Sequence, residues 1–375
     1  MIYLDNAATS GFKTYAVTET AINAIKYLSA NPGRSGHRLS VKGAETIFNA
    51  RKMLKTAFNA ESENKVIFTD GCTSALNMAI LGSVKKGGNV VTTVFEHNSV
   101  LRPLYYLKNS GQITLTIVEP IKNEPFYKTI ANAVKDDTYL VAVNGASNVT
   151  GEVIDIYSLG RLLKNTGVLF LVDGAQILGH VDFDMQDARV DMLAVAGHKG
   201  LGGILGSGAL ILSDKTDLNP IKHGGTGSET FNLSQPTCYP ERLEAGTLNL
   251  PAIASLGEAV SFTYKNAERF GQLLSNRLKR VLSVLRNLKN VTVYSDVNPC
   301  GIVAFNVNGF DSNEIAELLS TRYDIAVRGG YHCAPLMHLY LKTENTGVVR
   351  ASLSAQNTPS EINAFLTAVT ELSDF

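Results

Sequence analysis

Cysteine is scarce in this chain, with four in 375 residues, at positions 72, 238, 300 and 333. Thiols so few and so scattered exclude a disulfide framework and a zinc ribbon, since both need closely spaced pairs. An excess of charge of one sign is also missing, because 34 basic residues balance 34 acidic residues. This balance argues against a nucleic-acid or anionic-membrane partner bound by bulk charge, but it allows a local basic pocket.

Long apolar runs and a targeting signal are lacking as well. No uninterrupted apolar run reaches the roughly 18 residues that a membrane-spanning helix needs, so no such helix is expected. The first residues, Met1 to Asp5, do not show the basic-then-apolar pattern of a signal peptide. Together with the few scattered cysteines, these features predict a cytoplasmic protein.

What is present is an alternation of helix and strand signals over residues 15–255, typical of a mostly parallel sheet covered by helices on both faces. The length of 375 residues favours two domains. We expect helices that include 16–29, 41–59 and 74–83, and seven strands at 65–69, 89–95, 113–118, 138–143, 167–172, 192–196 and 209–212.

The pattern changes near residue 256 and predicts a smaller α+β domain. A helical pattern, continuous or broken, covers 255–288, and further elements are expected as strands near 291–294, 302–306 and 325–328 and helices near 312–321 and 359–372. The predicted organisation is therefore an N-terminal arm (1–14) that packs on the small domain, a large domain (15–255) and a small C-terminal domain (256–375).

Two predicted strands end in residues of chemical interest, Asp173 and Lys199. Ligands of open α/β sheets bind beyond the carboxyl ends of the strands, so both side chains are expected in one crevice. A pyridoxal phosphate enzyme needs this pair: the lysine holds the aldehyde as a Schiff base, and the carboxylate keeps the pyridine nitrogen protonated. The alternatives are a surface lysine in a glycine-rich turn and an aspartate that caps the next helix.

Neighbouring strand ends carry further candidates. The turn from Gly71 to Ser74 predicts a phosphate site at a helix N-terminus, although Thr73 or Ser74 in a plain N-cap is the alternative. His97 is positioned to stack on the pyridine ring and relay protons, unless it is only a satisfied loop histidine. Gln176, about one helical turn after Asp173, is expected to reach the phenolic oxygen of the cofactor.

Two residues near the C-terminus point to substrate chemistry. Arg350 lies in an apolar stretch and would bind a planar anion such as an α-carboxylate, the alternative being a structural salt bridge. Cys333 lies on a glycine-rich loop, where reactive groups are common, the alternative being a small buried cysteine. His332, Cys333 and His338 lie too close together, without a distant fourth ligand, to predict a zinc site, and we expect no metal.

In their order along the chain, these residues resemble the cysteine desulfurase and selenocysteine lyase family of the class V aminotransferase superfamily. The resemblance runs from Tyr3–Ala8 to about Thr358 and includes the segments 244–247 and 328–334. It implies a pyridoxal phosphate cofactor, with Lys199, His97 and Cys333 in catalysis. The cofactor contacts that it implies are Cys72, Thr73, His97, Asn148, Asp173, Gln176, His198, Lys199 and Thr247, and the substrate contacts are Arg34, Asn148 and Arg350.

The resemblance also implies an assembly and a reaction. Thr247 matches a residue donated by the neighbouring subunit, which implies a homodimer with shared active sites. The expected reaction converts L-cysteine to L-alanine and leaves a persulfide on Cys333, with L-selenocysteine as a further substrate. The form Arg-x-Gly-x-His-Cys-Ala at 328–334 resembles the second desulfurase group, whose members tend to pass the persulfide to a partner protein.

Two other functions remain open at this point. One is a class V aminotransferase or lyase that does not use Cys333. The other is a weakly catalytic, cofactor-bound protein that handles sulfur or selenium for a partner. The second is favoured by two departures from the family pattern: Ala196 replaces the usual serine or threonine, and the loop 201–206 lacks the usual proline. Gly145 also departs from the pattern, because histidine is frequent at this position.

Overall fold

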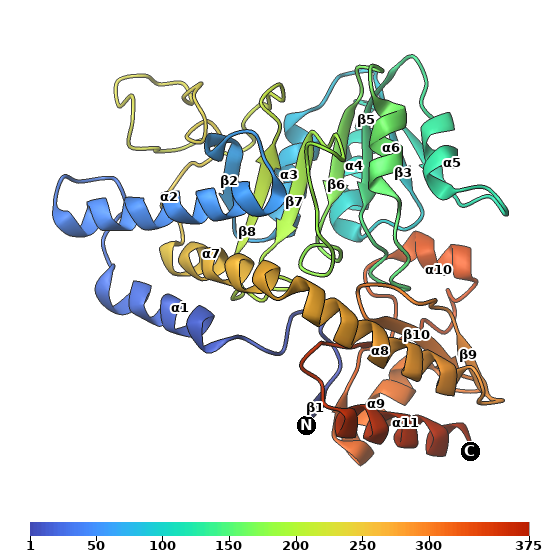
Figure 1. Cartoon of the computed structure of the whole chain (residues 1–375). Helices are drawn as coiled ribbons and strands as arrows, with labels where there is room; N and C mark the ends of the chain where they lie inside the picture. The colour runs from blue at the N-terminus through green and yellow to red at the C-terminus, as the bar shows by residue number, and fades with distance from the viewer. Residues whose placement is uncertain (375) are drawn as a thin grey trace.

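The large sheet has seven strands in the order β2-β8-β7-β6-β5-β3-β4 (Figure 1). This computed structural model describes residues 1–374. β8 runs antiparallel to β2 and β7, and all other neighbours are parallel, which confirms the predicted mostly parallel sheet. The strands are β2 (Val66–Thr69), β3 (Asn89–Thr93), β4 (Thr114–Val118), β5 (Thr138–Asn144), β6 (Leu169–Asp173), β7 (Met192–Ala196) and β8 (Gly208–Leu212).

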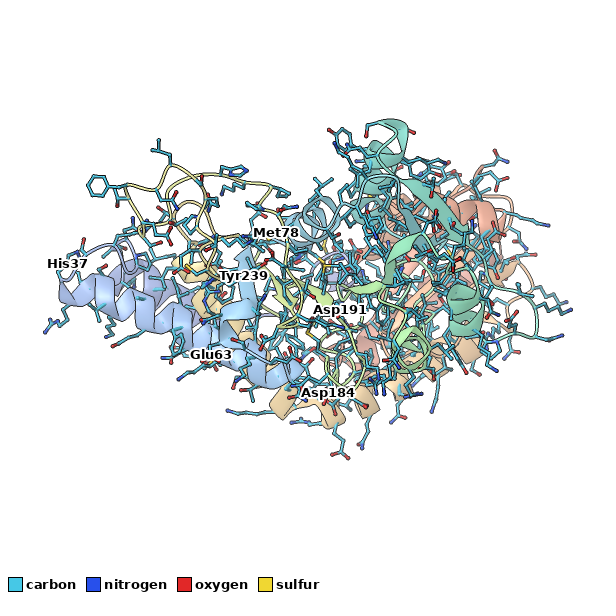
Figure 2. All side chains as sticks on the ribbon, turned by 90° about the horizontal axis from the view of Figure 1, so that it is seen from above. His37, Glu63, Met78, Asp184, Asp191 and Tyr239 are labelled. Atoms are coloured by element: carbon cyan, nitrogen blue, oxygen red, sulfur yellow. The ribbon has the colours of Figure 1, made fainter. Side chains whose placement is uncertain are left out.

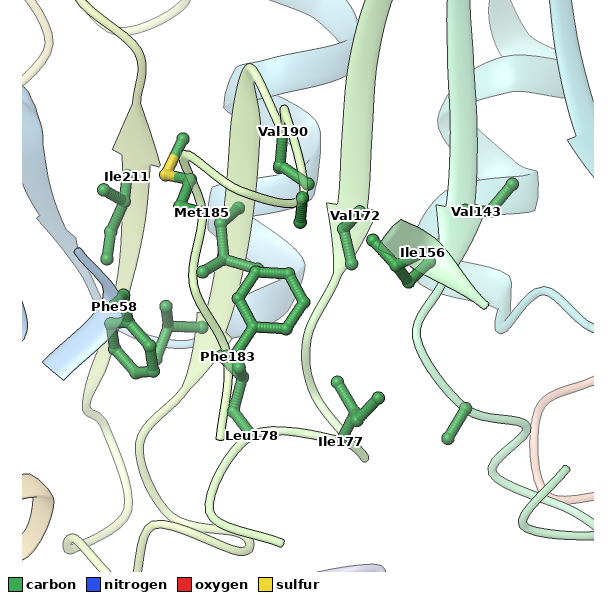
Figure 3. Packing of buried hydrophobic residues seen from close by; sticks show 14 of the residues in the cluster. Phe58, Val143, Ile156, Val172, Ile177, Leu178, Phe183, Met185, Val190 and Ile211 are labelled. Atoms are coloured by element: carbon green, nitrogen blue, oxygen red, sulfur yellow. The ribbon is translucent and has the colours of Figure 1, made fainter. Parts of the chain in front are cut away.

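Helices cover both faces of this sheet, as expected for strands that read as continuous apolar runs. Every residue of β3, β5, β7 and β8 is buried. Alternate strand residues belong to two core clusters, one on each face. Figure 3 shows part of the first cluster, in which Phe58, Phe183 and Met185 lie over the strands. The helices of this part are α1 (Tyr15–Tyr27), α2 (Arg38–Phe58), α3 (Cys72–Gly82), α4 (Asn98–Asn109), α5 (Phe126–Asn132), α6 (Ile156–Leu163) and α7 (Leu250–Lys265), with a 3-10 turn at Glu63–Lys65.

The C-terminal part is built on a three-stranded antiparallel sheet in the order β12-β10-β9. Its own core cluster includes Leu4 of the N-terminal segment. Next to that residue, β1 (Ile2–Tyr3) pairs in parallel with β11 (Ile325–Ala326), so the first residues lie on this part of the molecule. The other elements are β9 (Val291–Val293), β10 (Ile302–Val307), β12 (Val349–Ser352), α8 (Ala267–Leu285), α9 (Ser312–Tyr323), α10 (Pro335–Leu341) and α11 (Pro359–Ser373).

The long helical pattern over 255–288 forms two helices that meet at Asn266. α7 begins earlier than expected because the Asn249 side chain caps it by accepting a hydrogen bond from the Ala252 N–H at 3.3 Å. α7 packs on α1 and α2, whereas Leu274 and Leu278 of α8 lie in the C-terminal core. We therefore propose that the small domain begins at Asn266 rather than at residue 256.

Strand ends differ from the expected ones by a few residues. β3 ends at Thr93 rather than at residue 95, because the Thr93 hydroxyl accepts a hydrogen bond from the Phe95 N–H at 3.1 Å and turns the chain. Within residues 1–374, no helix combines the length and the apolar character needed to cross a bilayer.

Candidate active site

A cavity opens at the carboxyl ends of the parallel strands. It brings together every residue that the sequence predicted as a cofactor contact except Thr247. Those lining residues are Cys72, Thr73, His97, Asn148, Asp173, Gln176, His198 and Lys199. Because they come from strand ends and helix starts far apart in sequence, only the sheet topology unites them.

Asp173 is the last residue of β6 and lies at the centre of the sheet, paired with Asn144 of β5. Its side chain is buried, and Oδ1 accepts hydrogen bonds from the Ala175 N–H at 2.9 Å and the Cys72 thiol at 3.3 Å. The other carboxylate oxygen forms no hydrogen bond with residues 1–374. The side chain lines the cavity, so this oxygen is available to a cationic N–H group of a ligand.

Lys199 follows β7 in the turn that begins at Gly197. Burial lowers the pKa of its amine, and the charges of Arg350 and Arg328 lower it further, whereas the negative charge of Asp173 opposes them. The amine donates no hydrogen bond to residues 1–374. A lowered pKa favours the neutral amine, which is the form that acts as a nucleophile or base.

His97 is the N-cap of α4, which fixes its ring at the cavity wall. Nδ1 accepts a hydrogen bond from the Ser99 N–H at 3.0 Å, so the proton of the neutral ring lies on Nε2. Burial lowers the pKa of His97 to about 4, and the ring is neutral at physiological pH. His97 therefore presents one N–H to the cavity.

The first turn of α3 forms the anion-binding end of the cavity. Its N-cap is Gly71, which has no side chain to bond the free N–H groups of the first turn. Cys72 and Thr73 of this turn line the cavity. Free backbone N–H groups and the helix dipole favour a phosphate at such a position.

Asn148 links the cavity to the Cys333 loop. Its Nδ2 donates to the His332 carbonyl at 2.7 Å, and its Oδ1 is a buried acceptor without a donor in residues 1–374. Gln176 on the other side donates Nε2–H to the Ala7 carbonyl of the N-terminal arm at 3.0 Å. The unpaired Asn148 oxygen is a further sign that a polar ligand belongs here.

Cys333 is exposed and lines a second hollow. This hollow shares Thr73, His97 and Ser99 with the first cavity, so the two adjoin. His332 and Cys333 both have left-handed φ angles, +49° and +56°, which are unfavourable for side-chain-bearing residues. Hydrogen bonds from the Asn98 N–H to the Cys333 carbonyl at 2.7 Å and from His332 Nε2–H to the Val348 carbonyl at 3.0 Å hold the loop in this shape.

Arg350 is 1% exposed and is already engaged. Its Nη2 pairs with Asp5 Oδ1 at 2.9 Å, and its Nη1 donates to the Asn148 carbonyl at 2.9 Å. The structure thus places the predicted carboxylate ligand next to Asn148, but behind the cavity lining and in an ion pair with the N-terminal arm.

Arg328 is the cation that the sequence analysis did not single out as a site residue. It is exposed and forms no ion pair within residues 1–374, and its charge lowers the pKa of both His97 and Lys199. The sequence does contain a signal for Arg328 as a site residue, because it is the first residue of the 328–334 motif.

Arg34 and Thr247 do not reach this cavity within one chain. Arg34 Nη2 donates to the Gly225 and Gly246 carbonyls at 3.3 Å each, and Arg34 lines a separate hollow beside α2. Thr247 is exposed. Both remain candidates only for a site that a second chain completes.

Two other sequence observations have a structural answer. A Cβ atom at Gly145 would lie 2.5 Å from Ile177 Cγ2, so the packing of Ile177 leaves no room for the histidine that is frequent there.

The rings of His332 and His338 lie 6.2 Å apart, and within residues 1–374 no three His, Cys, Asp or Glu side chains are grouped to hold a metal ion.

Comparison with known families gives one match over nearly the whole chain. The model of the family described as aminotransferase class V matches residues 2–365. A probable cysteine desulfurase of Pyrococcus abyssi is 32% identical over 99% of this chain and 94% of that protein. A probable cysteine desulfurase of Methanothermobacter thermautotrophicus is 31% identical over 96% of this chain and 92% of that protein.

Solved structures show the same similarity. The apo structure of a cysteine desulfurase from Thermococcus onnurineus NA1 matches with a TM-score of 0.92 at 30% identity, over 100% of this chain and 94% of that one. The cysteine desulfurase CsdA of Escherichia coli matches with a TM-score of 0.88 over 99% of this chain and 94% of that one. Its identity is 24%, so this second match bears on the fold alone.

Proposed function

The chain belongs to the class V aminotransferase family, and we propose that it is a pyridoxal phosphate-dependent cysteine desulfurase. One observation carries the proposal: the cavity that holds Lys199 and Asp173 adjoins the hollow that holds the Cys333 thiol, and they share His97. A lysine–aspartate pair alone would serve many reactions of the family, whereas an exposed thiol beside it is what sulfur transfer needs.

The residues of the cavity fit pyridoxal phosphate. Asp173 offers a carboxylate oxygen for the ring nitrogen, and the first turn of α3 offers N–H groups for the phosphate. Lys199 would hold the aldehyde, and His97 would lie against the ring. When bound, this cofactor supplies an electron sink for the carbanion formed at the α carbon of the substrate.

Lys199 and His97 manage protons in the proposed reaction. Burial lowers the pKa of Lys199 and so favours its neutral amine, the form in which Nζ can take the α-proton of the substrate. His97 carries a proton on Nε2 at the boundary of the two hollows, where it can pass to the substrate. Both groups are fixed, one by burial and one by capping α4.

Cys333 receives the sulfur. Its Sγ attacks the sulfur of cysteine as a thiolate, an S–S bond forms, and the Cβ–S bond of the substrate breaks. The electron pair of that bond remains on Cβ, which takes a proton, so alanine leaves and Cys333 keeps a persulfide. The same residues would serve L-selenocysteine, because one larger chalcogen atom changes little in the packing.

The test pairs a spectrum with a product assay. Purified protein incubated with pyridoxal phosphate should turn yellow, and borohydride should attach the cofactor to Lys199. Cys333→Ser should keep this absorbance and lose alanine and persulfide production from cysteine. Cys238→Ser, which removes the other exposed thiol, is the matched control and should behave as wild type. Unchanged cysteine turnover by Cys333→Ser would refute the proposed role of the thiol and favour a family member that does not use it.

A second copy of the chain is proposed to complete the site. Phe231 and Leu233 are 100% exposed on a loop that projects from the same side as α2 (Figures 1 and 2). Figure 2 shows His37 at the outer end of α2, well away from the body of the molecule. Exposed apolar side chains on projecting segments favour an interface. The hollow that Arg34 lines lies beside α2. Its lining also includes Gly246 and Leu248, the two neighbours of Thr247 in sequence.

Mixed dimers test this assembly. Chains with Lys199→Ala and chains with Thr247→Ala should each be impaired alone. Random mixing should restore about a quarter of the wild-type activity, because half of the dimers then contain one intact site of two. Failure of the mixture to exceed both parents would contradict a shared active site.

A thiol-bearing partner protein is proposed as the acceptor of the persulfide. The Cys333 hollow runs between α3 and α4, and its wall includes the exposed side chains of Arg102 and Tyr106. The four cysteines of this chain are free thiols, which fits a reducing compartment such as the cytoplasm. Transfer of labelled sulfur from Cys333 to a candidate acceptor, and its loss in Arg102→Glu, would test the partner and its docking site together.

A further inference from the structure

The carboxyl group of Glu96 lies one residue before His97 and is completely buried. It forms no ion pair within residues 1–374. Oε1 accepts hydrogen bonds from the Thr93 hydroxyl at 2.7 Å and the Asn144 N–H at 3.2 Å, while Oε2 has no partner. Burial of a carboxylate with neither a cation nor a full set of donors costs free energy. These surroundings therefore favour the neutral acid.

Asn144 also has a buried side-chain oxygen without a hydrogen-bond donor. Its Nδ2 donates to the Phe95 carbonyl at 2.5 Å, but its Oδ1 is a buried acceptor without a donor in residues 1–374. Glu96 and Asn144 are already joined through Oε1 and the Asn144 N–H. Two acceptors on adjoining residues remain unpaired if Glu96 is ionised. A proton on Oε2 would remove the negative charge and turn one of them into a donor.

We propose that Glu96 is a positioning residue that works as a neutral carboxylic acid, tying the end of β3 to the end of β5. The tie holds two residues of the cavity wall, His97 and Asn144. It also bears on Asp173, because Asn144 pairs with Asp173 in the sheet and the Gly145 N–H donates to the Asp173 carbonyl at 2.9 Å. The consequence for catalysis rests on the proposed function, whereas the protonation state of Glu96 does not.

The surroundings of Glu96 support this state. Burial raises the pKa of Glu96 to about 8, and the negative charge of Asp173 raises it as well, against the hydrogen bonds from Thr93 and Asn144. Asp173 on β6 is the charged group that acts on it, while β3 and β5 contribute only neutral groups, the Thr93 hydroxyl and the Asn144 N–H. Above about pH 8, Glu96 would place a second negative charge beside Asp173.

The sign of the effect on stability follows from the raised pKa. Between the ordinary pKa of a glutamate, about 4.3, and the raised value of about 8, the folded chain binds a proton that the unfolded chain has lost. Stability from this group is therefore complete at low pH and decreases as the pH rises through that window. Glu96→Gln carries no titratable proton, and its amide, like the neutral acid, has both a hydrogen-bond donor and an acceptor.

Thermal unfolding of the protein saturated with pyridoxal phosphate, measured from pH 5.5 to 8.5, is the test. The Tm of Glu96→Gln relative to wild type should rise steadily with pH, whereas Glu96→Ala should lower the Tm throughout and weaken cofactor binding. Glu317→Gln, which changes an exposed glutamate on α9, should track wild type at every pH. The proposal would be overturned if Glu96→Gln kept a constant offset from wild type, or if it lost as much Tm and cofactor affinity as Glu96→Ala.

Repeating the series with Cys333→Ser in every chain separates this proposal from the desulfurase assignment. No sulfur transfer is expected in that background, yet the pH-dependent Tm difference between chains that keep Glu96 and chains with Glu96→Gln should persist. Its disappearance would overturn the Glu96 assignment, whereas turnover by the Cys333→Ser parent would overturn only the role of the thiol.

Discussion

The Cys72 thiol donates a hydrogen bond to Asp173 Oδ1, with 3.3 Å between sulfur and oxygen. Burial raises the pKa of this thiol well above its usual value, and the negative charge of Asp173 raises it further. A thiol in this state is a hydrogen-bond donor and not a nucleophile, because nucleophilic attack requires the thiolate. The cavity therefore holds one inert cysteine, while the reactive candidate lies in the adjoining hollow.

The four cysteines should accordingly differ in reactivity. Cys333 and Cys238 are exposed and should react rapidly with a disulfide reagent at pH 7.5, whereas Cys72, which is half-buried and has a raised pKa, should react slowly, and the buried Cys300 only on unfolding. Burial raises the pKa of Cys300 to about 12, so it too stays protonated. Mapping of the labelled peptides over time would check this order, and labelling of Cys72 as fast as Cys333 would contradict it.

Removal of the Arg328 charge should shift the pH dependence of turnover. The positive charge of Arg328 lowers the pKa of Lys199, so Arg328→Ala should raise that pKa. Lys199 acts as a neutral base only in the substrate complex, so the alkaline rise of kcat, which reports the groups of that complex, should move to higher pH in the variant. Arg322→Ala, at an exposed position on α9, is the control. An unshifted pH profile for Arg328→Ala would show that this charge does not reach the amine.

Removal of one partner from the ion pair between Arg51 and Glu244 should destabilise the fold strongly. Their side chains are only 6% and 5% exposed, and Glu244 also accepts a hydrogen bond from the Phe68 N–H at 2.6 Å. Glu244→Ala leaves the Arg51 cation buried without its partner, which should lower the free energy of unfolding by about 3–5 kcal/mol. Urea denaturation of the cofactor-saturated protein would measure this loss in the free energy of unfolding.

A double variant provides the control for that pair. Arg51→Met combined with Glu244→Leu removes both charges and should recover much of the stability lost by Glu244→Ala. A loss below about 1 kcal/mol for the single variant would place the pair with weak surface ion pairs instead.

Gly145 should tolerate no side chain while Ile177 is in place. Because a Cβ atom there would lie 2.5 Å from Ile177 Cγ2, Gly145→Ala should destabilise the fold. The expected loss from overpacking is about 1–3 kcal/mol. In a double-mutant cycle with Ile177→Ala, which removes the crowded Cγ2 atom, the two changes should cost less than their sum. Strict additivity would contradict direct crowding.

Much of the fold followed from local pattern. The strands buried on both faces read as continuous apolar runs, and their alternation with amphipathic segments predicted the mostly parallel sheet that was confirmed. The family was confirmed as well, because its motif residues are spread over nearly the whole chain and occur in a fixed order. The break at Asn266 was harder to predict from the sequence, since apolar residues occur at helical spacing both before and after this residue.

The environment of the site residues was harder to predict from the sequence. The ion pair of Arg350 with Asp5 joins residues 345 positions apart, and no local pattern indicates it. Glu96 lies next to His97 in sequence, yet its burial without a cation depends on Thr93 and Asn144 being placed around it by two different strands.

The sequence by itself determined the chemical groups and the strand ends on which they lie, because covalent order fixes Asp173 after one apolar run and Lys199 after another. Only the tertiary structure decided which groups are buried, paired or unpaired: it paired Arg350, isolated the carboxyl of Glu96 and left Cys333 exposed. The reason is that desolvation and hydrogen bonding depend on distance in space, and the residues that supply them are brought together by the packing of distant segments.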